Sequence, residues 1–146
     1  MSDFRDMARD PKHRRRFEKL LYLACKRGDA DLVAERLSWG IDPNCTFARG
    51  KTPLIANVRS SNPSAGTVEA LLKAGADVNA QNQNDHWGTT PLHAAAHANQ
   101  TAIAQLLIDN GADINVRDMS GKTPLFHTTF HKAKAVAKLL EKCGAI

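Results

Sequence analysis

Residues Gly88 to Asn115 read GTTPLHAAAHANQTAIAQLLIDNGADIN, and parts of this stretch return elsewhere in the chain at nearly constant spacing. Thr-Pro-Leu occurs at Thr52, Thr90 and Thr123, and the last two threonines are 33 residues apart. Gly-Ala-Asp or a close variant follows each of them. Self-similarity at a period of this size indicates a stack of similar structural units rather than one closed core.

Each unit is predicted to contain two short helices. Pro91 opens the first helix, because the amide hydrogen that proline lacks has no partner in a first helical turn, and Thr90 is placed to cap it. Alanines such as Ala95 let neighbouring helices approach closely. Thr101–Asp109 is the second helix, and Gly111 ends it in a left-handed conformation. Neither helix can bury its apolar face alone, so the units must stack.

The 33-residue period, with T-P-L-H from Thr90 and G-A-D-I-N from Gly111, resembles the ankyrin repeat. The resemblance covers residues 19–146 and implies an all-α solenoid of stacked helix-turn-helix units with β-hairpin fingers. We expect repeats at about residues 19–44, 45–79, 80–115 and 116–146, after a basic N-terminal extension over residues 1–18 that is helical from about residue 11. For function, the resemblance implies protein binding and leaves the partner open.

Three segments depart from the repeat pattern. Asp10 and Pro11 are predicted to open one long helix over Lys12 to Lys26, in place of a Thr-Pro start. The second repeat holds two extra residues, which the polar Ser60–Ala65 stretch accommodates, and its Asn57 replaces a packed alanine as either a weak point or a hydrogen-bonded feature. The last helix is expected over Lys132 to Cys143.

Composition excludes several classes of protein. No apolar run approaches the ~18 residues of a membrane helix, and Met1 does not begin a secretory leader. Cys25, Cys45 and Cys143 are odd in number and lack C-x-x-C spacing, which argues against a disulfide framework or a zinc ribbon and favours the cytoplasm. The net charge of +5 favours acidic partners. We expect a monomer.

Histidine pairs are the candidates for metal chemistry. His93 and His97 are four residues apart, and so are His127 and His131, so each pair could grip an ion from one helix. HAAAH lacks the glutamate of the H-E-x-x-H protease motif, however, and the histidine of T-P-L-H resembles a structural residue that bonds neighbouring turns. Cys25 and Cys143 belong to no nucleophile signature and are expected on apolar helix faces. We therefore expect no metal, no cofactor and no enzymatic activity.

In ankyrin repeats the concave side, made by hairpin tips and first helices, is the usual surface for binding other proteins. The matching positions here are basic at one end and aromatic at the other, which predicts an acidic, partly apolar segment of another protein as partner. These predicted binding residues are Lys26, Arg27, Arg49, Lys51, Arg59, His86, Trp87, Thr89, His97, Met119, Ser120, Lys122, Phe130 and His131.

Two alternatives stay open at this stage. Trp87, on the longest finger, either anchors a partner or packs on the adjacent finger. The KHRRR run from Lys12 to Arg16 is a charged solvent face of a terminal cap, or it binds nucleic acid or an acidic surface, which we regard as the second choice.

Overall fold

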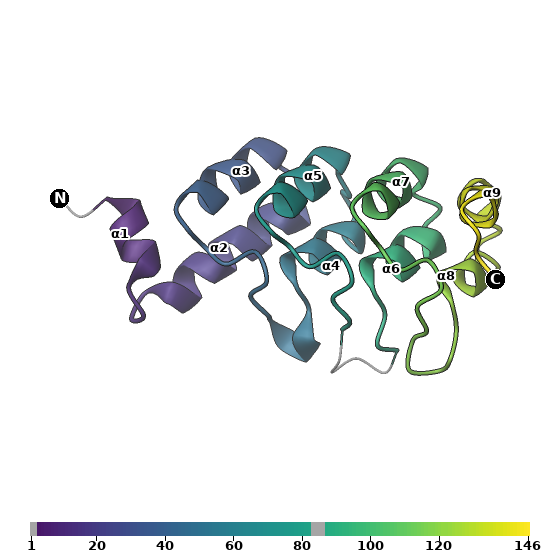
Figure 1. The fold of residues 1–146 in the computed structure, drawn as a ribbon. Helices are drawn as coiled ribbons and strands as arrows, with labels where there is room; N and C mark the ends of the chain where they lie inside the picture. The colour runs from purple at the N-terminus through teal and green to yellow at the C-terminus, as the bar shows by residue number, and fades with distance from the viewer. Residues whose placement is uncertain (1–2, 83–86) are drawn as a thin grey trace. The chain divides into compact units, whose positions relative to one another are not determined.

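The computed structural model describes residues 3–82 and 87–146 and divides them into two compact units. Unit 1 comprises the residues up to Thr46 together with Thr52–Ala76, and unit 2 comprises Phe47–Lys51 and Asp77–Ile146. Both units consist of paired helices (Figure 1). Among the helices in the described part of the chain, none is long and apolar enough to cross a membrane.

Unit 1 is built from two stacked helix pairs and one additional helix. Its helices are α1 (Phe4–Arg9), α2 (Arg14–Arg27), α3 (Ala30–Ser38), α4 (Pro53–Val58) and α5 (Ala65–Lys73). α2 pairs with α3 and α4 with α5, while α2 packs on α4 and α3 on α5. Leu21, Leu54 and Leu71 are buried where these helices meet. Each helix pair therefore buries its apolar face against the other pair, and the two pairs share one apolar core.

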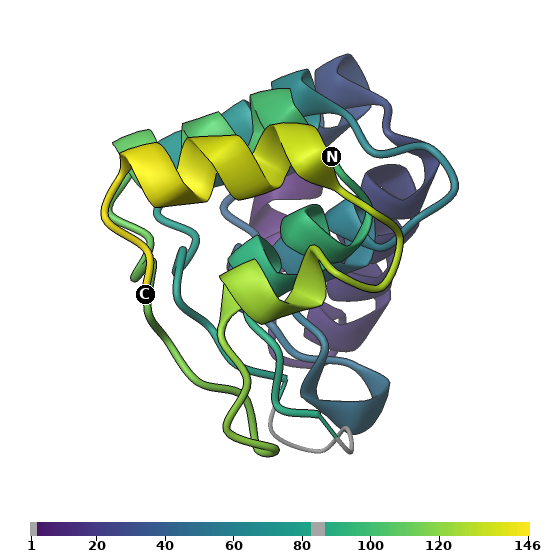
Figure 2. The ribbon, with the colours of Figure 1, turned by 90° about the vertical axis from the view of Figure 1, so that its right-hand side faces the viewer.

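Unit 2 repeats this plan. It contains the short turn η1 (Ala48–Gly50) and the helices α6 (Pro91–His97), α7 (Thr101–Asp109), α8 (Pro124–His127) and α9 (Lys134–Lys142). α6 packs on α8 and α7 on α9, and Figure 2 looks onto the pair of α8 and α9, with α9 in yellow. Ile103, Leu107 and Leu140 are buried between the layers. The expected all-α stack of helix pairs is confirmed.

The Thr-Pro steps begin helices as predicted. Each threonine hydroxyl accepts a hydrogen bond from the backbone amide three residues later, at 3.3 Å for Thr52, 3.4 Å for Thr90 and 3.4 Å for Thr123. Proline occupies the first helical position after each of them. This pairing satisfies amides that the first turn leaves without partners and fixes where each first helix starts.

The N-terminal region differs from the single long helix that the sequence predicts. The carboxylate of Asp10 accepts from the Lys12 amide at 2.9 Å and meets the His13 ring at 3.2 Å, and this turn delays the start of α2 to Arg14. The additional helix α1 precedes the turn, and its Phe4 ring stacks on Trp39 at a centroid distance of 5.4 Å. Aromatic stacking thus places α1 against the end of α3.

The fingers contain less strand than the resemblance implies. In residues 3–82 and 87–146, the antiparallel bridge between Phe47 and Lys51 is the single β pairing. Near Trp87, the Asn82 amide donates a hydrogen bond to the Thr89 carbonyl at 3.0 Å. The segments Phe47–Lys51 and Asp118–Lys122 are tight turns more than hairpins.

Asparagines connect neighbouring repeats within each unit. The side-chain amide of Asn44 donates to the Gly75 carbonyl at 3.0 Å in unit 1, and that of Asn79 donates to the Gly111 carbonyl at 3.3 Å in unit 2. The Asn115 side chain accepts from the Ile146 amide at 3.0 Å. We call these three contacts the asparagine ladder.

Asn57 is a hydrogen-bonded feature rather than a weak point. Its side chain is fully buried on α4, donates to the Cys25 carbonyl at 2.7 Å and accepts from the Ser64 amide at 3.2 Å. The second bond holds the longer turn between α4 and α5, where the two extra residues lie. The amide that replaces an alanine therefore organises the insertion.

Candidate functional site

The finger turn from Asp118 to Lys122 gives unit 2 a fixed edge. The Asp118 amide donates to the Lys122 carbonyl and the Gly121 amide to the Asp118 carbonyl, both at 2.9 Å. The Asp118 carboxylate also accepts from the amides of Ser120 and Lys122, each at 2.9 Å. A side chain that satisfies two amides inside its own turn restricts the backbone to one shape.

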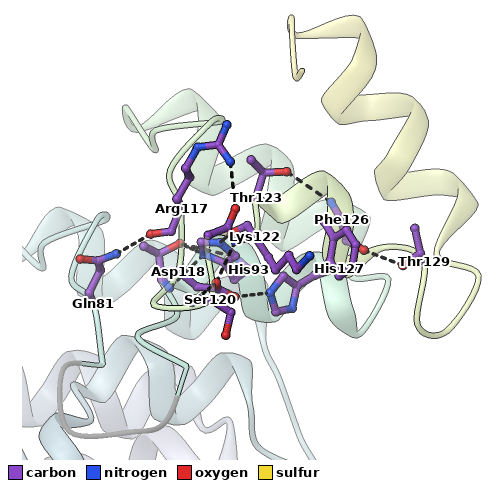
Figure 3. Close-up of polar contacts among 12 residues, drawn as sticks. Gln81, His93, Arg117, Asp118, Ser120, Lys122, Thr123, Phe126, His127 and Thr129 are labelled. Atoms are coloured by element: carbon purple, nitrogen blue, oxygen red, sulfur yellow. Dashed lines mark hydrogen bonds and ion pairs between the residues drawn. The ribbon is translucent and has the colours of Figure 1, made fainter.

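His93 joins α6 to this finger turn (Figure 3). Its Nε2 lies 2.9 Å from the Lys122 carbonyl, and its Nδ1 lies 3.2 Å from the Thr90 amide. The amide can only donate and the carbonyl can only accept, so the ring is neutral with its proton on Nε2. Burial lowers the pKa of His93, against the raising effect of the Lys122 carbonyl. The structural use predicted for this histidine is confirmed.

Asp118 and His127 form a buried hydrogen-bonded pair. The His127 Nε2 lies 2.8 Å from an Asp118 oxygen (Figure 3). Burial raises the pKa of the Asp118 carboxyl, but the Lys122 amide, the His127 ring and the Ser120 amide outweigh it, so this pKa is lowered from its ordinary value. The carboxylate is therefore ionised at neutral pH and ties α8 to the finger.

These three residues, His93, Asp118 and His127, bring possible metal ligands within 4.8 Å of one another. Their ligand atoms already serve the fold, because His93 bonds Thr90 and Lys122, and the Asp118 carboxylate bonds His127 and two amides. An ion at this place would break contacts that position α6, α8 and the finger. The cluster is a structural network.

Large apolar side chains of unit 2 are exposed in two neighbouring pairs, which we call together the aromatic face. The residues that form this aromatic face are Trp87 (52% exposed), Met119 (68%), Phe126 (39%) and Phe130 (60%). The Met119 amide donates to the Trp87 carbonyl at 2.9 Å, which joins the two fingers. The rings of Phe126 and Phe130 meet edge to face at 5.6 Å. Exposed clusters of this kind commonly mark interaction surfaces.

Basic and imidazole groups border the aromatic face. The Lys122 ammonium lies 4.2 Å from the centre of the Phe126 ring, as a cation–π contact. The His97 ring lies 5.9 Å from Phe130 and 4.5 Å from His131. The face therefore combines rings, a sulfur side chain and positive charge on a surface carried by short, hydrogen-bonded elements.

The turn Phe47–Lys51 presents Arg49 in a strained conformation. Arg49 has φ of 64°, in the left-handed region that side chains disfavour. Ser120 holds the same place in the finger turn of Asp118 and is not among the non-glycine residues with positive φ. Asp118 supports its turn with a carboxylate, whereas the corresponding residue here is Phe47. Strained positions of this kind cluster at functional sites.

The predicted binding residues fall into three groups. The first group is exposed to solvent, except for Lys51, which is half-buried. Its members are Lys26, Arg27, Arg49, Lys51, Arg59, Trp87, His97, Met119, Ser120, Lys122, Phe130 and His131. Thr89 is 4% exposed and cannot contact a partner, because its backbone closes the finger on Asn82; its inclusion was wrong. His86 lies outside the described residues.

The basic run before α2 is partly engaged within the chain. The Arg15 guanidinium donates to the Thr46 carbonyl at 2.7 Å and to Glu18 at 3.2 Å. Arg14 and Arg16 are exposed. The run thus contains the first residues of α2, and Arg15 contacts the backbone just after the first repeat.

The three cysteines carry free thiols. Cys25 and Cys45 are buried, and burial raises the pKa of both to about 12, so neither is a thiolate at neutral pH. Cys143 is exposed just after α9, which corrects the expectation of an apolar helix face, because the helix ends one residue earlier at Lys142.

Two functional features escaped sequence reasoning. Phe126 belongs to the aromatic face, but it was not among the predicted binding residues. Asp118 organises the finger, and the spacing Asp118-x-Ser120 typical of a side-chain-supported turn is the signal that could have revealed it.

A family model of ankyrin repeats (three copies) matches residues 60–145. The chain belongs to the ankyrin repeat family. Among curated proteins, the rabbit ankyrin repeat and SOCS box protein 5 is 38% identical over 95 residues, which are 65% of this chain and 27% of that protein. The human SH3 and multiple ankyrin repeat domains protein 1 is 35% identical over 102 residues, which are 69% of this chain and 4% of that protein.

A third similar protein is named as an enzyme. The glycerophosphocholine phosphodiesterase gde1 of Schizosaccharomyces pombe is 36% identical over 106 residues, which are 72% of this chain and 9% of that protein. The chain thus spans about a quarter or less of these relatives. The ankyrin repeats matched over residues 60–145 of this chain are in general protein-binding modules.

Proposed function

We propose that this ankyrin chain is a protein-interaction module whose aromatic face binds an apolar segment of another protein that also carries acidic residues. The observation that supports the proposal most is the exposure of Trp87, Met119, Phe126 and Phe130, which lie in the neighbouring pairs Trp87–Met119 and Phe126–Phe130, in a chain with only 5% aromatic residues. Aromatic anchors commonly contribute about 2 kcal/mol or more each when a partner buries them.

Preorganisation supports the same proposal. Met119 lies over Gly88, where an added Cβ would come within 2.5 Å of the Met119 side chain. Asp118 fixes the turn from which Met119 and Lys122 project. A surface ordered before binding loses less conformational entropy in the complex, so more of its contact energy appears as affinity.

Charge determines the kind of partner. Lys122 adds a positive group beside Phe126, and the exposed Lys26, Arg27 and Arg59 make unit 1 basic at its predicted binding positions. Complementary charge raises association rates and selects against basic partners. A binding role rather than a catalytic one also agrees with the raised pKa values of Cys25 and Cys45, which leave both thiols unreactive.

A peptide-display selection tests the proposal. Peptides selected on the wild-type protein should be enriched in aromatic or aliphatic residues together with Asp or Glu. A selected peptide should then bind Trp87→Ala and Phe130→Ala proteins at least tenfold more weakly. Leu23→Ala removes an apolar side chain of unit 1 that is 41% exposed and should change affinity less than twofold. Equal effects of all three substitutions would reject the aromatic face as the binding surface.

A further inference from the structure

Two exposed histidines of unit 2 meet across neighbouring repeats. His97 is the last residue of α6, and His131 lies in the connection between α8 and α9. Their Nε2 atoms are 3.1 Å apart, and their rings are nearly perpendicular, with centroids 4.5 Å apart. The nitrogens are closer together than the ring centres, so the Nε2 edges of the two rings are turned toward each other.

The four-residue spacing of the histidines does not place both members of a pair at one site. Within each pair, His93 and His127 turn inward to the structural network, while His97 and His131 reach the surface. The two histidines that could hold one ion are therefore His97 and His131, which come from different repeats.

We propose that His97 and His131 together bind one first-row divalent transition-metal ion, such as Zn²⁺, through their Nε2 atoms. Two imidazole nitrogens bound to one tetrahedral zinc, each 2.0–2.1 Å from it, lie about 3.3 Å apart. The observed 3.1 Å needs only a small outward movement of exposed rings. Imidazole is a preferred ligand of zinc, copper and nickel ions. Solvent or a partner's side chain completes the coordination.

The surroundings of the pair support a site more than a chance contact. Lys132, the residue after His131, has φ of 52°, a left-handed conformation that a lysine disfavours. His131 directly precedes this turn, and its ring contacts His97 at the end of α6. Phe130 packs at 5.9 Å from the His97 ring and His127 at 6.3 Å, so one imidazole already has neighbours that orient it.

Zinc titration of the whole 146-residue protein, prepared without a histidine tag, tests the proposal. Isothermal titration with ZnCl₂ at about pH 7.5 should show one saturable site. His97→Ala and His131→Ala should each bind zinc at least tenfold more weakly, with unchanged circular dichroism spectra. His13→Ala, which removes a histidine of unit 1, should bind as the wild type does.

Two further readouts make the result specific. The imidazole NMR signals of His97 and His131 should shift with zinc, and MgCl₂ should leave them unchanged because Mg²⁺ prefers oxygen ligands. Absence of saturable zinc binding by the wild type would overturn the proposal. Undiminished binding by both alanine variants would overturn it equally, because the ion would then occupy another place.

Discussion

Replacing Arg49 by glycine should make the protein more stable, although it removes a large side chain. Arg49 has φ of 64°, and the left-handed conformation costs an ordinary residue about 1–2 kcal/mol. Glycine adopts it freely but loses about 0.5–1 kcal/mol through its more disordered unfolded chain. The free energy of unfolding should therefore rise by roughly 0.5–1 kcal/mol. For a chain of this size, the melting temperature should rise by about 1–4 °C.

Ser120→Gly is the matched control. Ser120 occupies the same place in a turn with the same two backbone hydrogen bonds, but without a positive φ. Glycine there relieves no strain and should lower stability by about 0.5–1 kcal/mol. Arg49→Ala separates the two roles of the arginine, because alanine keeps the strain and loses only the side chain. It should leave stability nearly unchanged.

Equilibrium urea unfolding followed by circular dichroism measures all three variants. Arg49→Gly and Ser120→Gly should change the free energy of unfolding with opposite signs, a difference of about 1–2 kcal/mol. If both glycine variants lose stability to the same extent, Arg49 is not strained and its conformation gives no support to a binding role. If Arg49→Gly is stabilised, weaker binding of a selected peptide by the same variant would show that the arginine is kept for contact rather than for folding.

Acidification should destabilise the protein below about pH 6.5. Burial lowers the pKa of His93 from its ordinary value of 6.5, so protonation favours the unfolded chain. The stability that the neutral ring contributes is complete above pH 6.5 and is lost as the pH falls through the pKa of the folded state. Urea titrations from pH 8 to 5 measure this, and His93→Gln should flatten the profile. Asn57→Ala should lower the free energy of unfolding by about 2–4 kcal/mol, because the Cys25 carbonyl and the Ser64 amide lose buried partners, and a loss below about 1 kcal/mol would contradict the hydrogen bonds described. Trp39→Ala should speed hydrogen exchange in α1 while leaving α6 and α7 protected. If α1 exchanges at the same rate in the variant as in the wild type, the stacking of Phe4 on Trp39 does not hold α1 in place.

Local chemistry made the repeat predictable. The Thr-Pro steps fixed the starts of α4, α6 and α8, and the second helix expected over Thr101–Asp109 has those bounds in the structure. Capping and proline act within one helical turn, so the signal lies in adjacent residues. The end of α8 was harder to foresee, because the Thr128 hydroxyl returns to the Leu125 carbonyl at 2.6 Å and the helix stops.

Long-range contacts explain what the sequence could not show. Phe4 and Trp39 stack across 35 positions, and no local period connects them, so α1 was missed. The aromatic face was only partly predicted for a similar reason. Phe130 and Trp87 were chosen by alignment, but the exposure of Phe126 depends on how early α8 ends.

The asparagine ladder connects neighbouring repeats at turns other than the finger tips and the turns within a helix pair. Its contacts join Asn44 to Gly75, Asn79 to Gly111 and Asn115 to Ile146, all at turns that follow a second helix. Extra residues at a finger tip or between the helices of a pair leave these contacts in place. Such loops can therefore change in length and composition while the spacing of the array persists, which allows new recognition properties to evolve, or to be engineered, without redesign of the scaffold.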